Sequence, residues 1–442
     1  MFEKFFKLKE NNTTVRTELD AALATFMTMA YIIFVNPQIL SAAGMDTGAV
    51  MAATCISAAI ATIVMGLYAN YPIALAPGMG LNAYFAFTAV PYITERLKEQ
   101  GIDASSQSWQ VALAAVFVSG CFFLLITLMK IREKIINGIP DTIKYATAAG
   151  IGLFIAFIGL KGAGIIVANP ATFVMLGKFS APETLMAIGG LLLISFLMIK
   201  KVKGAILIGI LTTTVIGIIY GINDLPTSIF ALPDMSPTFL KMDFNGLWAV
   251  GIFDIIFVFL FVDMFDTVGT LVGVGEQGGF IKNGKLPRAG KAMTADAVGT
   301  MVGAVCGTST VTSYIESGAG VAEGGKTGLT SLFVGIFFIL ALFFAPIAGI
   351  IPAYATAPAL IIVGILMASN ISKINWKDMS DAIPGFFTLL MMPLTYSIAT
   401  GLALGFILYP LCKLFAGKWK EVSILTAILA FLFVLRFVFL AV

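Results

Sequence analysis

The sequence predicts an all-α polytopic membrane protein: a 14-helix unit arranged as a 7+7 inverted repeat, followed by an extra C-terminal apolar helix. Three observations support this fold class. First, the 442 residues are 59% hydrophobic and only 12% charged, with a mean hydropathy of +0.98, whereas soluble chains are about 25% charged. Second, apolar segments of roughly membrane-spanning length recur along the whole chain. Third, positive residues cluster in short links between these segments.

Taken in order, the chain contains fifteen apolar segments, several of them too short or too interrupted to be plain spans. They lie at residues 20–40, 48–69, 73–93, 109–129, 140–161, 183–199, 204–221, 248–272, 290–306, 308–325, 328–350, 355–369, 383–396, 397–415 and 421–441. The stretch 383–415 is broken around Pro393, so we count it as two short helices that cross twice.

The distribution of Lys and Arg predicts the orientation. Positive clusters in the N-terminal tail (residues 1–19) and after the fourth, sixth and eighth segments fall on one side if every segment crosses once. The opposite loop 222–247 carries only Lys241. The positive-inside rule then predicts a multi-pass protein of the cell membrane with a cytoplasmic N-terminus.

A weak internal repeat predicts the two inverted halves. GIPDTIKYATAAGIGLFI (138–155) and GIIPAYATAPALIIVGILM (349–367) are each followed by two apolar segments. An interrupted segment precedes each of them: LAPGMGLNAYFAF (75–87) and CGTSTVTSYIESGAG (306–320). Halves of seven segments have opposite orientations because seven is odd, which is the layout of an inverted-repeat secondary transporter.

The third segment is expected to be discontinuous. Pro77 lacks a backbone donor and is followed by Gly78, which favours a break. We expect extended backbone through 73–76 and a helix from Met79, with Asn82 in its first turn. An ordinary span with a proline kink is the alternative.

The tenth segment is expected to break in the same way. The β-branched and hydroxyl-bearing residues 308–314 favour extended backbone. Helix is expected to resume near Ile315, with Glu316 in its first turn. Non-helical backbone at membrane depth persists where it is buried in protein or lines a cavity, so two such breaks indicate a midplane site for a polar ligand.

The eighth segment carries two acidic residues on one helix face. Asp263 and Asp266 are three positions apart, which places them about 60° apart around the helix axis. Intramembrane carboxylates mark functional sites by default, and two so close repel unless one is protonated or each has a partner. The alternative is that Asp263, Asp266 and Glu316 only hold helices together through buried hydrogen bonds.

Several classes of protein are excluded or disfavoured. The chain has no histidine, so a proton carried in function must be held by a carboxylate, Tyr, Lys or Cys. The four cysteines show no CxxC spacing, and we expect no metal, no cofactor, no enzymatic activity and no nucleic-acid partner. The GxGxxG match at 273–278 follows an apolar helix, and the GxxxxGK match at 279–285 is followed by Leu286 rather than Ser or Thr, so neither is a nucleotide-binding loop.

Four separated motifs resemble those of the AzgA-like purine permeases, a branch of the nucleobase–cation symporters with the UraA-like fold. They are LAPGMGLNAYFAF, FVDMFDTVGTL, TSTVTSYIESGAGVAEGGKTGL and MMPLTYSIATGLALGF. The resemblance implies a core domain (20–129 and 248–350), a gate domain (135–222 and 352–415) and, outside them, the extra helix (421–442). It also implies uptake of adenine, guanine or hypoxanthine with a proton, commonly by a homodimer.

The resemblance assigns purine contacts to Asn82, Asp263 and Glu316, and a role in transport to Asp266. Ser313 in the hydroxyl-rich stretch and Tyr84 as a flat aromatic surface complete the expected substrate-binding set, with Phe85 or Phe26 as other aromatic candidates for that surface. Carboxylates accept hydrogen bonds from purine N–H groups, and an amide both donates and accepts. We expect Asp266, together with Asp263, to couple purine to proton movement.

Other functions stay open at this point. The main alternative is a transporter of the same fold for uracil, xanthine, ascorbate or an inorganic anion. An anion transporter would be expected to place Arg or Lys at the site, and the two broken segments have none near their breaks. A channel, a membrane enzyme and a purely structural protein are weaker alternatives.

Overall fold

A computed structural model of the chain describes residues 2–101, 107–129, 138–223, 225, 228, 230–250, 253–282 and 286–439. Within that part, eight helices are long and apolar enough to cross a membrane, and four shorter apolar helices accompany them. The prediction of an all-α polytopic membrane protein is confirmed.

The chain divides into two compact units: residues 1–128 with 163–359, and residues 129–162 with 360–442. These units are defined by packing. The core and gate domains expected from the sequence are defined by function, and that division stays a prediction.

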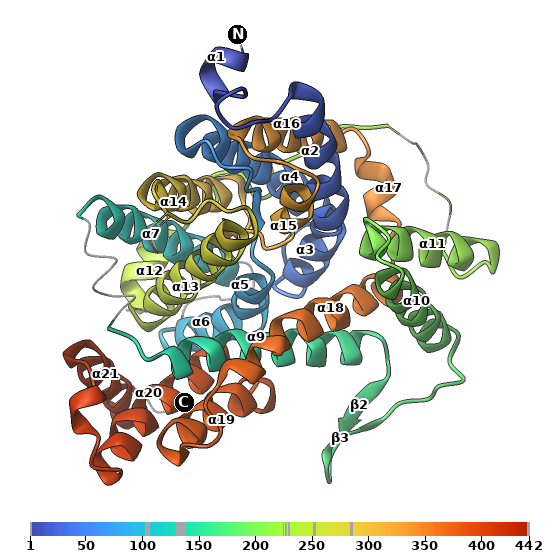
Figure 1. Cartoon of the computed structure of the whole chain (residues 1–442). Helices are drawn as coiled ribbons and strands as arrows, with labels where there is room; N and C mark the ends of the chain where they lie inside the picture. The colour runs from blue at the N-terminus through green and yellow to red at the C-terminus, as the bar shows by residue number, and fades with distance from the viewer. Residues whose placement is uncertain are drawn as a thin grey trace. The chain divides into compact units, whose positions relative to one another are not determined.

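The first unit contains two short strands that pair with each other, a separate two-stranded hairpin and most of the helices. Its helices are α1 (Phe2–Phe6), α2 (Val15–Met29), α3 (Ile32–Ser41), α4 (Thr47–Val64), α5 (Met79–Tyr84), α6 (Val90–Glu99), α7 (Ser108–Leu128), α10 (Pro182–Ile199), α11 (Ala205–Ile219), α12 (Phe244–Val250), α13 (Phe253–Gln277), α14 (Ala289–Cys306), α15 (Ser317–Ala322), α16 (Gly328–Ala341), α17 (Ala345–Gly349) and the first part of α18 (Ala353–Ala368). Helices α7, α13 and α14 pack together, and α15 lies against α2 (Figure 1).

The first apolar segment, expected as one helix over 20–40, is two helices. Helix α2 begins earlier, after Thr14, whose hydroxyl accepts a hydrogen bond from the backbone N–H of Thr17 at 3.2 Å. It ends at Met29, and α3 begins at Ile32 and contains Pro37, which cannot donate a bond to the preceding turn. The break leaves Tyr31 buried between the two helices.

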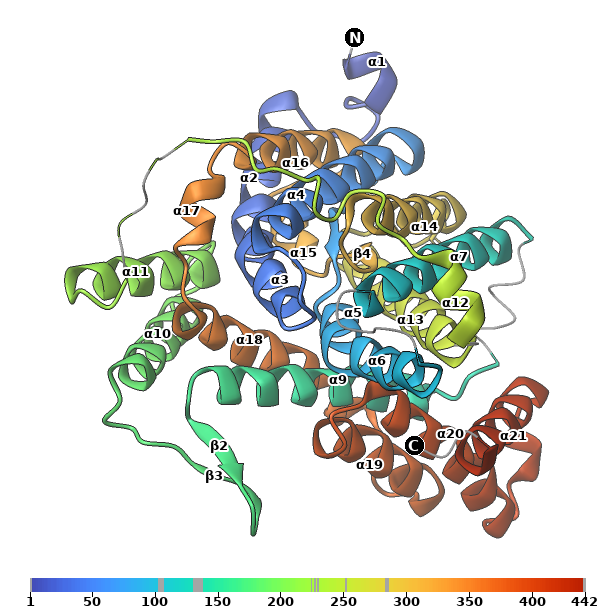
Figure 2. The ribbon, with the colours of Figure 1, turned by 180° about the vertical axis from the view of Figure 1, so that it is seen from behind.

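The two broken segments meet as a small antiparallel sheet. Strand β1 (Leu75–Pro77) pairs with β4 (Val311–Ser313), with Ala76 opposite Thr312. This pairing satisfies backbone groups that lipid could not satisfy at membrane depth. Figure 2 shows β4 beside α14 from behind. The predicted breaks at 73–78 and 308–314 are confirmed, and the simple proline kink is excluded for the third segment.

A second hairpin was not expected from the sequence. Strands β2 (Ile166–Asn169) and β3 (Phe173–Leu176) pair between the fifth and sixth apolar segments. The side-chain oxygen of Asn169 accepts from the backbone N–H groups of Ala171 and Thr172 at 2.8 and 3.1 Å, which stabilises the turn.

The second unit is built from α9 (Asp141–Gly162), the end of α18, α19 (Met379–Leu394), α20 (Ile398–Phe415) and α21 (Ile424–Phe439). The expected break near Pro393 is confirmed, because α19 ends at Leu394 and Ser397 caps α20. The extra C-terminal apolar helix is α21.

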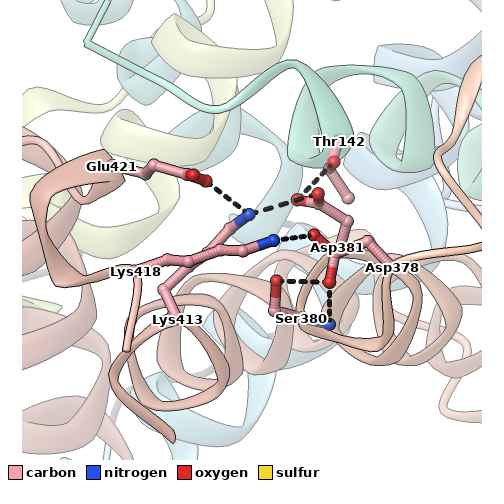
Figure 3. Close-up of polar contacts among 7 residues, drawn as sticks. All are labelled: Thr142, Asp378, Ser380, Asp381, Lys413, Lys418 and Glu421. Atoms are coloured by element: carbon pink, nitrogen blue, oxygen red, sulfur yellow. Dashed lines mark hydrogen bonds and ion pairs between the residues drawn. The ribbon is translucent and has the colours of Figure 1, made fainter. Parts of the chain in front are cut away.

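A network of ion pairs joins the ends of these helices (Figure 3). The ammonium of Lys413, a side chain only 2% exposed, lies 3.2 Å from Asp381 and 2.7 Å from Glu421. Lys418 pairs with Asp378 at 2.6 Å, and the hydroxyl of Thr142 on α9 donates to Asp381 at 3.0 Å. The network therefore ties α9, α19, α20 and the link to α21 together.

Candidate functional site

The candidate site is built around the paired strands of the two broken segments. The backbone N–H of Gly78 donates to the carbonyl of Thr310 at 2.9 Å, and that of Tyr314 donates to the carbonyl of Ala74 at 3.0 Å. Helix α5 follows β1 directly, starting at Met79 as expected. Because the strands are antiparallel, α5 and α15 leave the small sheet at opposite ends.

Glu316 lies just before its helix rather than in the first turn, where it was expected. Helix α15 begins at Ser317, so Glu316 is the N-cap residue rather than a first-turn residue. The reason is the turn after β4, in which the backbone N–H of Ser317 donates to the carbonyl of Tyr314 at 3.1 Å. The carboxylate of Glu316 makes no side-chain cap bond to the first turn of α15.

Helix α2 and the residues just after it hold Glu316 in place. The hydroxyl of Tyr31 donates to Oε1 of Glu316 at 2.7 Å, and that of Thr28 donates to the Glu316 carbonyl at 3.4 Å. One turn further along α15, a Cβ on Gly320 would collide with the Thr25 side chain and the Ala21 backbone. The absence of a side chain at Gly320 therefore permits the close contact that orients the carboxylate.

Asn82 links the two broken segments. It is fully buried on α5. Its Oδ1 accepts a hydrogen bond from the hydroxyl of Ser309, which precedes β4. Its Nδ2 donates to the carbonyl of Pro77 at 3.4 Å, and the Tyr314 hydroxyl donates to the same carbonyl at 2.5 Å.

Helices α13 and α14 form a square of two aspartates and two threonines. On α13, Asp263 accepts from the hydroxyl of Thr300 at 3.1 Å. On α14, Asp296 accepts from the hydroxyl of Thr267 at 2.7 Å. On each helix the aspartate lies four residues before the threonine, so the two side chains are on the same helix face. Each Asp–Thr hydrogen bond therefore runs from one helix to the other. Ser313 of β4 adds a 3.0 Å bond to Asp296.

The expected site residues all belong to the first unit, but they differ in accessibility. Asp263, Ser313 and Tyr84 are 1%, 2% and 1% exposed, whereas Asp266 and Glu316 are only partly buried. Asp266 is close enough to Glu316 for the two carboxylates to interact electrostatically. Asp266 and Glu316 are therefore the more accessible carboxylates of this group, and Asp263 is the more deeply buried one.

The aromatic candidates are packed against neighbouring helices. The ring of Tyr84 contacts Phe259 edge to face, with centroids 5.0 Å apart, and Phe85 contacts the same ring at 6.3 Å. Phe26 packs on Phe338 of α16 at 5.2 Å. In this conformation the three rings support the helices around the site.

Two residues of this cluster, Asp296 and Tyr31, were not selected from the sequence. Asp296 is a fully buried carboxylate inside the ninth apolar segment. The general rule that intramembrane carboxylates are functional would have identified it. Tyr31 carries no such signal, since a buried tyrosine in an apolar segment is common and its partner lies 285 positions away.

Comparison with known proteins adds evidence of descent. The sequence profile of the Permease family matches residues 16–404. The adenine permease AdeP of Escherichia coli is 43% identical over 441 residues, covering 100% of this chain and 96% of that protein. The guanine/hypoxanthine permease PbuG of Bacillus subtilis is 46% identical over 448 residues, covering 99% of each chain.

A solved structure has the same fold. The transmembrane domain of a cyanobacterium bicarbonate transporter, BicA, superimposes with a TM-score of 0.64 at 18% identity and covers 88% of this chain and 97% of that chain. The similarity confirms the predicted 7+7 inverted-repeat fold.

Proposed function

Because the chain belongs to the Permease family, as the match over residues 16–404 establishes, we propose that it imports purine nucleobases through the cell membrane by proton symport. The resemblance to the AzgA-like purine permeases is confirmed by the full-length relatives, and the chain is a transporter rather than an enzyme. Hypoxanthine, guanine and adenine are the proposed substrates. The N-terminus is proposed to be cytoplasmic and the protein to act as a homodimer.

The observation that carries this proposal is the full-length similarity to permeases named for adenine and for guanine/hypoxanthine, and the polar set around β1 and β4 of this chain supports it. Asn82, Asp263, Glu316, Ser313 and Tyr84 are the proposed substrate-binding residues. A purine presents ring N–H donors and ring nitrogen acceptors in one plane, which carboxylates and an amide complement. Oε1 of Glu316 already accepts from Tyr31, so Oε2 is the oxygen proposed to accept from the base.

Proton coupling is proposed to use the carboxylates of α13, Asp266 and Asp263. The chain has no histidine, and carboxylates in an apolar segment are the groups best placed to exchange a proton. Alternating access is proposed to occur by movement of the core domain against the gate domain, as in other inverted-repeat transporters.

Uptake into proteoliposomes tests this function. Radiolabelled hypoxanthine should accumulate under an inward pH gradient, and unlabelled adenine or guanine should compete, whereas ascorbate and bicarbonate should not. Empty liposomes are the control. Uptake of no purine above that control would overturn the purine assignment, and uptake of uracil, xanthine, ascorbate or bicarbonate in its place would identify the alternative transporter.

A further inference from the structure

The Asp263–Asp296 pair is the most deeply buried acidic pair of the candidate site. The two side chains are 1% and 0% exposed, and they lie on facing helices, joined by the Thr300–Asp263 and Thr267–Asp296 hydrogen bonds. Of the ion pairs that the described residues make, none involves either of them. Two adjacent ionised carboxylates without a cation repel each other and are costly to bury.

Each carboxylate of the pair has one satisfied and one unsatisfied oxygen. Oδ2 of Asp263 accepts from Thr300, and Oδ1 of Asp296 accepts from Thr267 and Ser313. Oδ1 of Asp263 and Oδ2 of Asp296 are buried and receive no hydrogen bond from the described part of the chain. Buried acceptors without donors are rare, and such a group indicates a missing partner.

We propose, as an extension of the proton symport proposed above on which it rests, that Asp263 and Asp296 together hold the co-transported proton between their two unsatisfied oxygens. The proton enters from the outer solution, forms an O–H bond on one carboxyl and donates a hydrogen bond to the other. The charge of the pair thereby changes from −2 to −1. When the proton leaves to the cytoplasm with the purine, the pair returns to −2.

A proton fits this arrangement better than a metal cation. The free acceptors of the pair are two, one on each carboxyl, which is the number that one bridging proton satisfies. A hard cation requires a shell of several oxygen ligands. The hydroxyl of Thr267 donates to Asp296 at 2.7 Å, and that of Thr300 is shared between Asp263 at 3.1 Å and the Val311 carbonyl at 3.0 Å.

The surrounding groups connect the pair to the ligand. The titratable group that interacts with the pair is Asp266 on α13. Asp266 interacts in turn with Glu316, Tyr31 and Tyr314. Asp266 is partly exposed and is the group that would pass the proton between solvent and the pair. Ser313 of β4 bonds to Asp296, and Glu316 follows that strand by three residues, so a charge change at the pair acts on the segment that holds the ligand.

The test counts protons. Purified protein in a weakly buffered solution with a pH-indicator dye is mixed with hypoxanthine over a series of pH values, and proton uptake is divided by purine bound. Wild type should take up about one proton per purine at the pH of maximal uptake, because binding favours the protonated form. Asp296→Asn should take up no proton. Its amide N–H takes the place of the shared proton as the hydrogen-bond donor to Asp263, at every pH. Asp296→Glu should restore part of the uptake.

Glu18→Gln is the matched control. Glu18 is also fully buried, but its carboxylate accepts from the backbone N–H groups of Lys326, Thr327 and Thr330 at 3.1, 3.3 and 3.2 Å. Donors therefore surround it already, and its substitution should leave the proton count at the wild-type value. If Asp296→Asn does not fold, Asp296→Ser replaces it, because either substitution removes the carboxyl that shares the proton and leaves Asp263 in place.

The outcomes separate this inference from the proposed function. A proton count in Asp296→Asn equal to that of wild type overturns the inference while purine transport stands, as does purine binding that depends on Na⁺ and not on pH. If wild type binds no purine, the proposed function fails. Infrared spectra of the ligand-free protein then decide. A protonated-carboxyl band that titrates in wild type and in Glu18→Gln but is missing in Asp296→Asn supports the shared proton. The same band in Asp296→Asn as in wild type overturns it.

Discussion

The hydroxyl of Tyr31 donates a 2.7 Å hydrogen bond to Oε1 of Glu316, 285 positions later in the chain. Tyr31 lies in the break between α2 and α3, and Glu316 at the N-cap of α15. One hydrogen bond between side chains therefore joins the break in the first apolar segment to the break in the tenth. This bond occupies one oxygen of the Glu316 carboxylate, and the other oxygen is the one that we propose to accept from the base.

Glu316→Gln is expected to weaken purine binding severely. The amide keeps the volume of the side chain and an oxygen that accepts from Tyr31, but it loses the charge. A hydrogen bond to a charged group contributes about 1.5–3 kcal/mol, which corresponds to a loss of roughly 10- to 150-fold in affinity. Equilibrium binding of labelled hypoxanthine to purified protein measures this loss. Binding within about threefold of wild type, less than 1 kcal/mol, would make Glu316 a structural residue.

Asn82→Ala is expected to raise the apparent KM and to change the ranking of the bases. An amide with both a donor and an acceptor is suited to distinguish keto from amino edges, and in the structure it already bonds to Ser309 and Pro77. Competition of hypoxanthine uptake by adenine and guanine measures the ranking. Ser309→Ala is the control, since it removes the partner and keeps the amide. An unchanged ranking with merely reduced expression would assign Asn82 to packing between the two breaks.

Asp266→Asn is expected to uncouple transport. The side chain is partly exposed and interacts with Glu316, so its neutral amide should still permit exchange of purine across the membrane. Without the carboxylate, however, the proton cannot pass to Asp263, and purine should not accumulate against a gradient. Uptake under an imposed inward pH gradient is compared with counterflow without one. Accumulation at the wild-type level would remove Asp266 from the coupling role.

The Asp378–Lys418 pair is expected to make stability depend on pH at the acidic end. Hydrogen bonds from Lys418 and then Ser380 hold the pKa of Asp378 below its usual range, and the bond to Asp378 raises the pKa of Lys418. A carboxylate with a lowered folded-state pKa adds stability above its unfolded value of about 3.9, and this stability is lost as the pH falls. The wild-type Tm should therefore exceed that of Asp378→Asn at pH 7.

The same comparison under acidic conditions checks the sign. The difference in Tm between wild type and Asp378→Asn should shrink below pH about 4, where Asp378 of the unfolded chain is protonated. Asparagine remains a good N-cap for α19, so the variant isolates the charge. Lys418→Met should show the same convergence. A constant difference down to the lowest pH at which the protein folds would contradict the assignment to this ion pair.

Local sequence signals were sufficient to predict the breaks. Pro77 and Gly78 cannot continue a helix, and the hydroxyl-rich residues 308–314 favour extended backbone, so both strands were expected where β1 and β4 lie. Glu316 was expected in the first turn of its helix but is the N-cap residue, because a turn follows β4 and the helix begins only at Ser317. The division of the first segment at Tyr31 was missed, since no glycine or proline marks that point and tertiary contacts stabilise it.

The sequence by itself determined the membrane class, the apolar segments, both discontinuities and three candidate carboxylates in a chain without histidine, and the structure added Asp296 as a fourth. The tertiary structure decided which of these carboxylates are neighbours. Asp263 and Asp266 share a helix, but Asp263 is the buried partner of Asp296 of α14, and the partly exposed Asp266 interacts electrostatically with Glu316. Spacing along one helix determines which face a side chain occupies. The residue that it meets depends on the helix packed against that face, which is a long-range property of the fold.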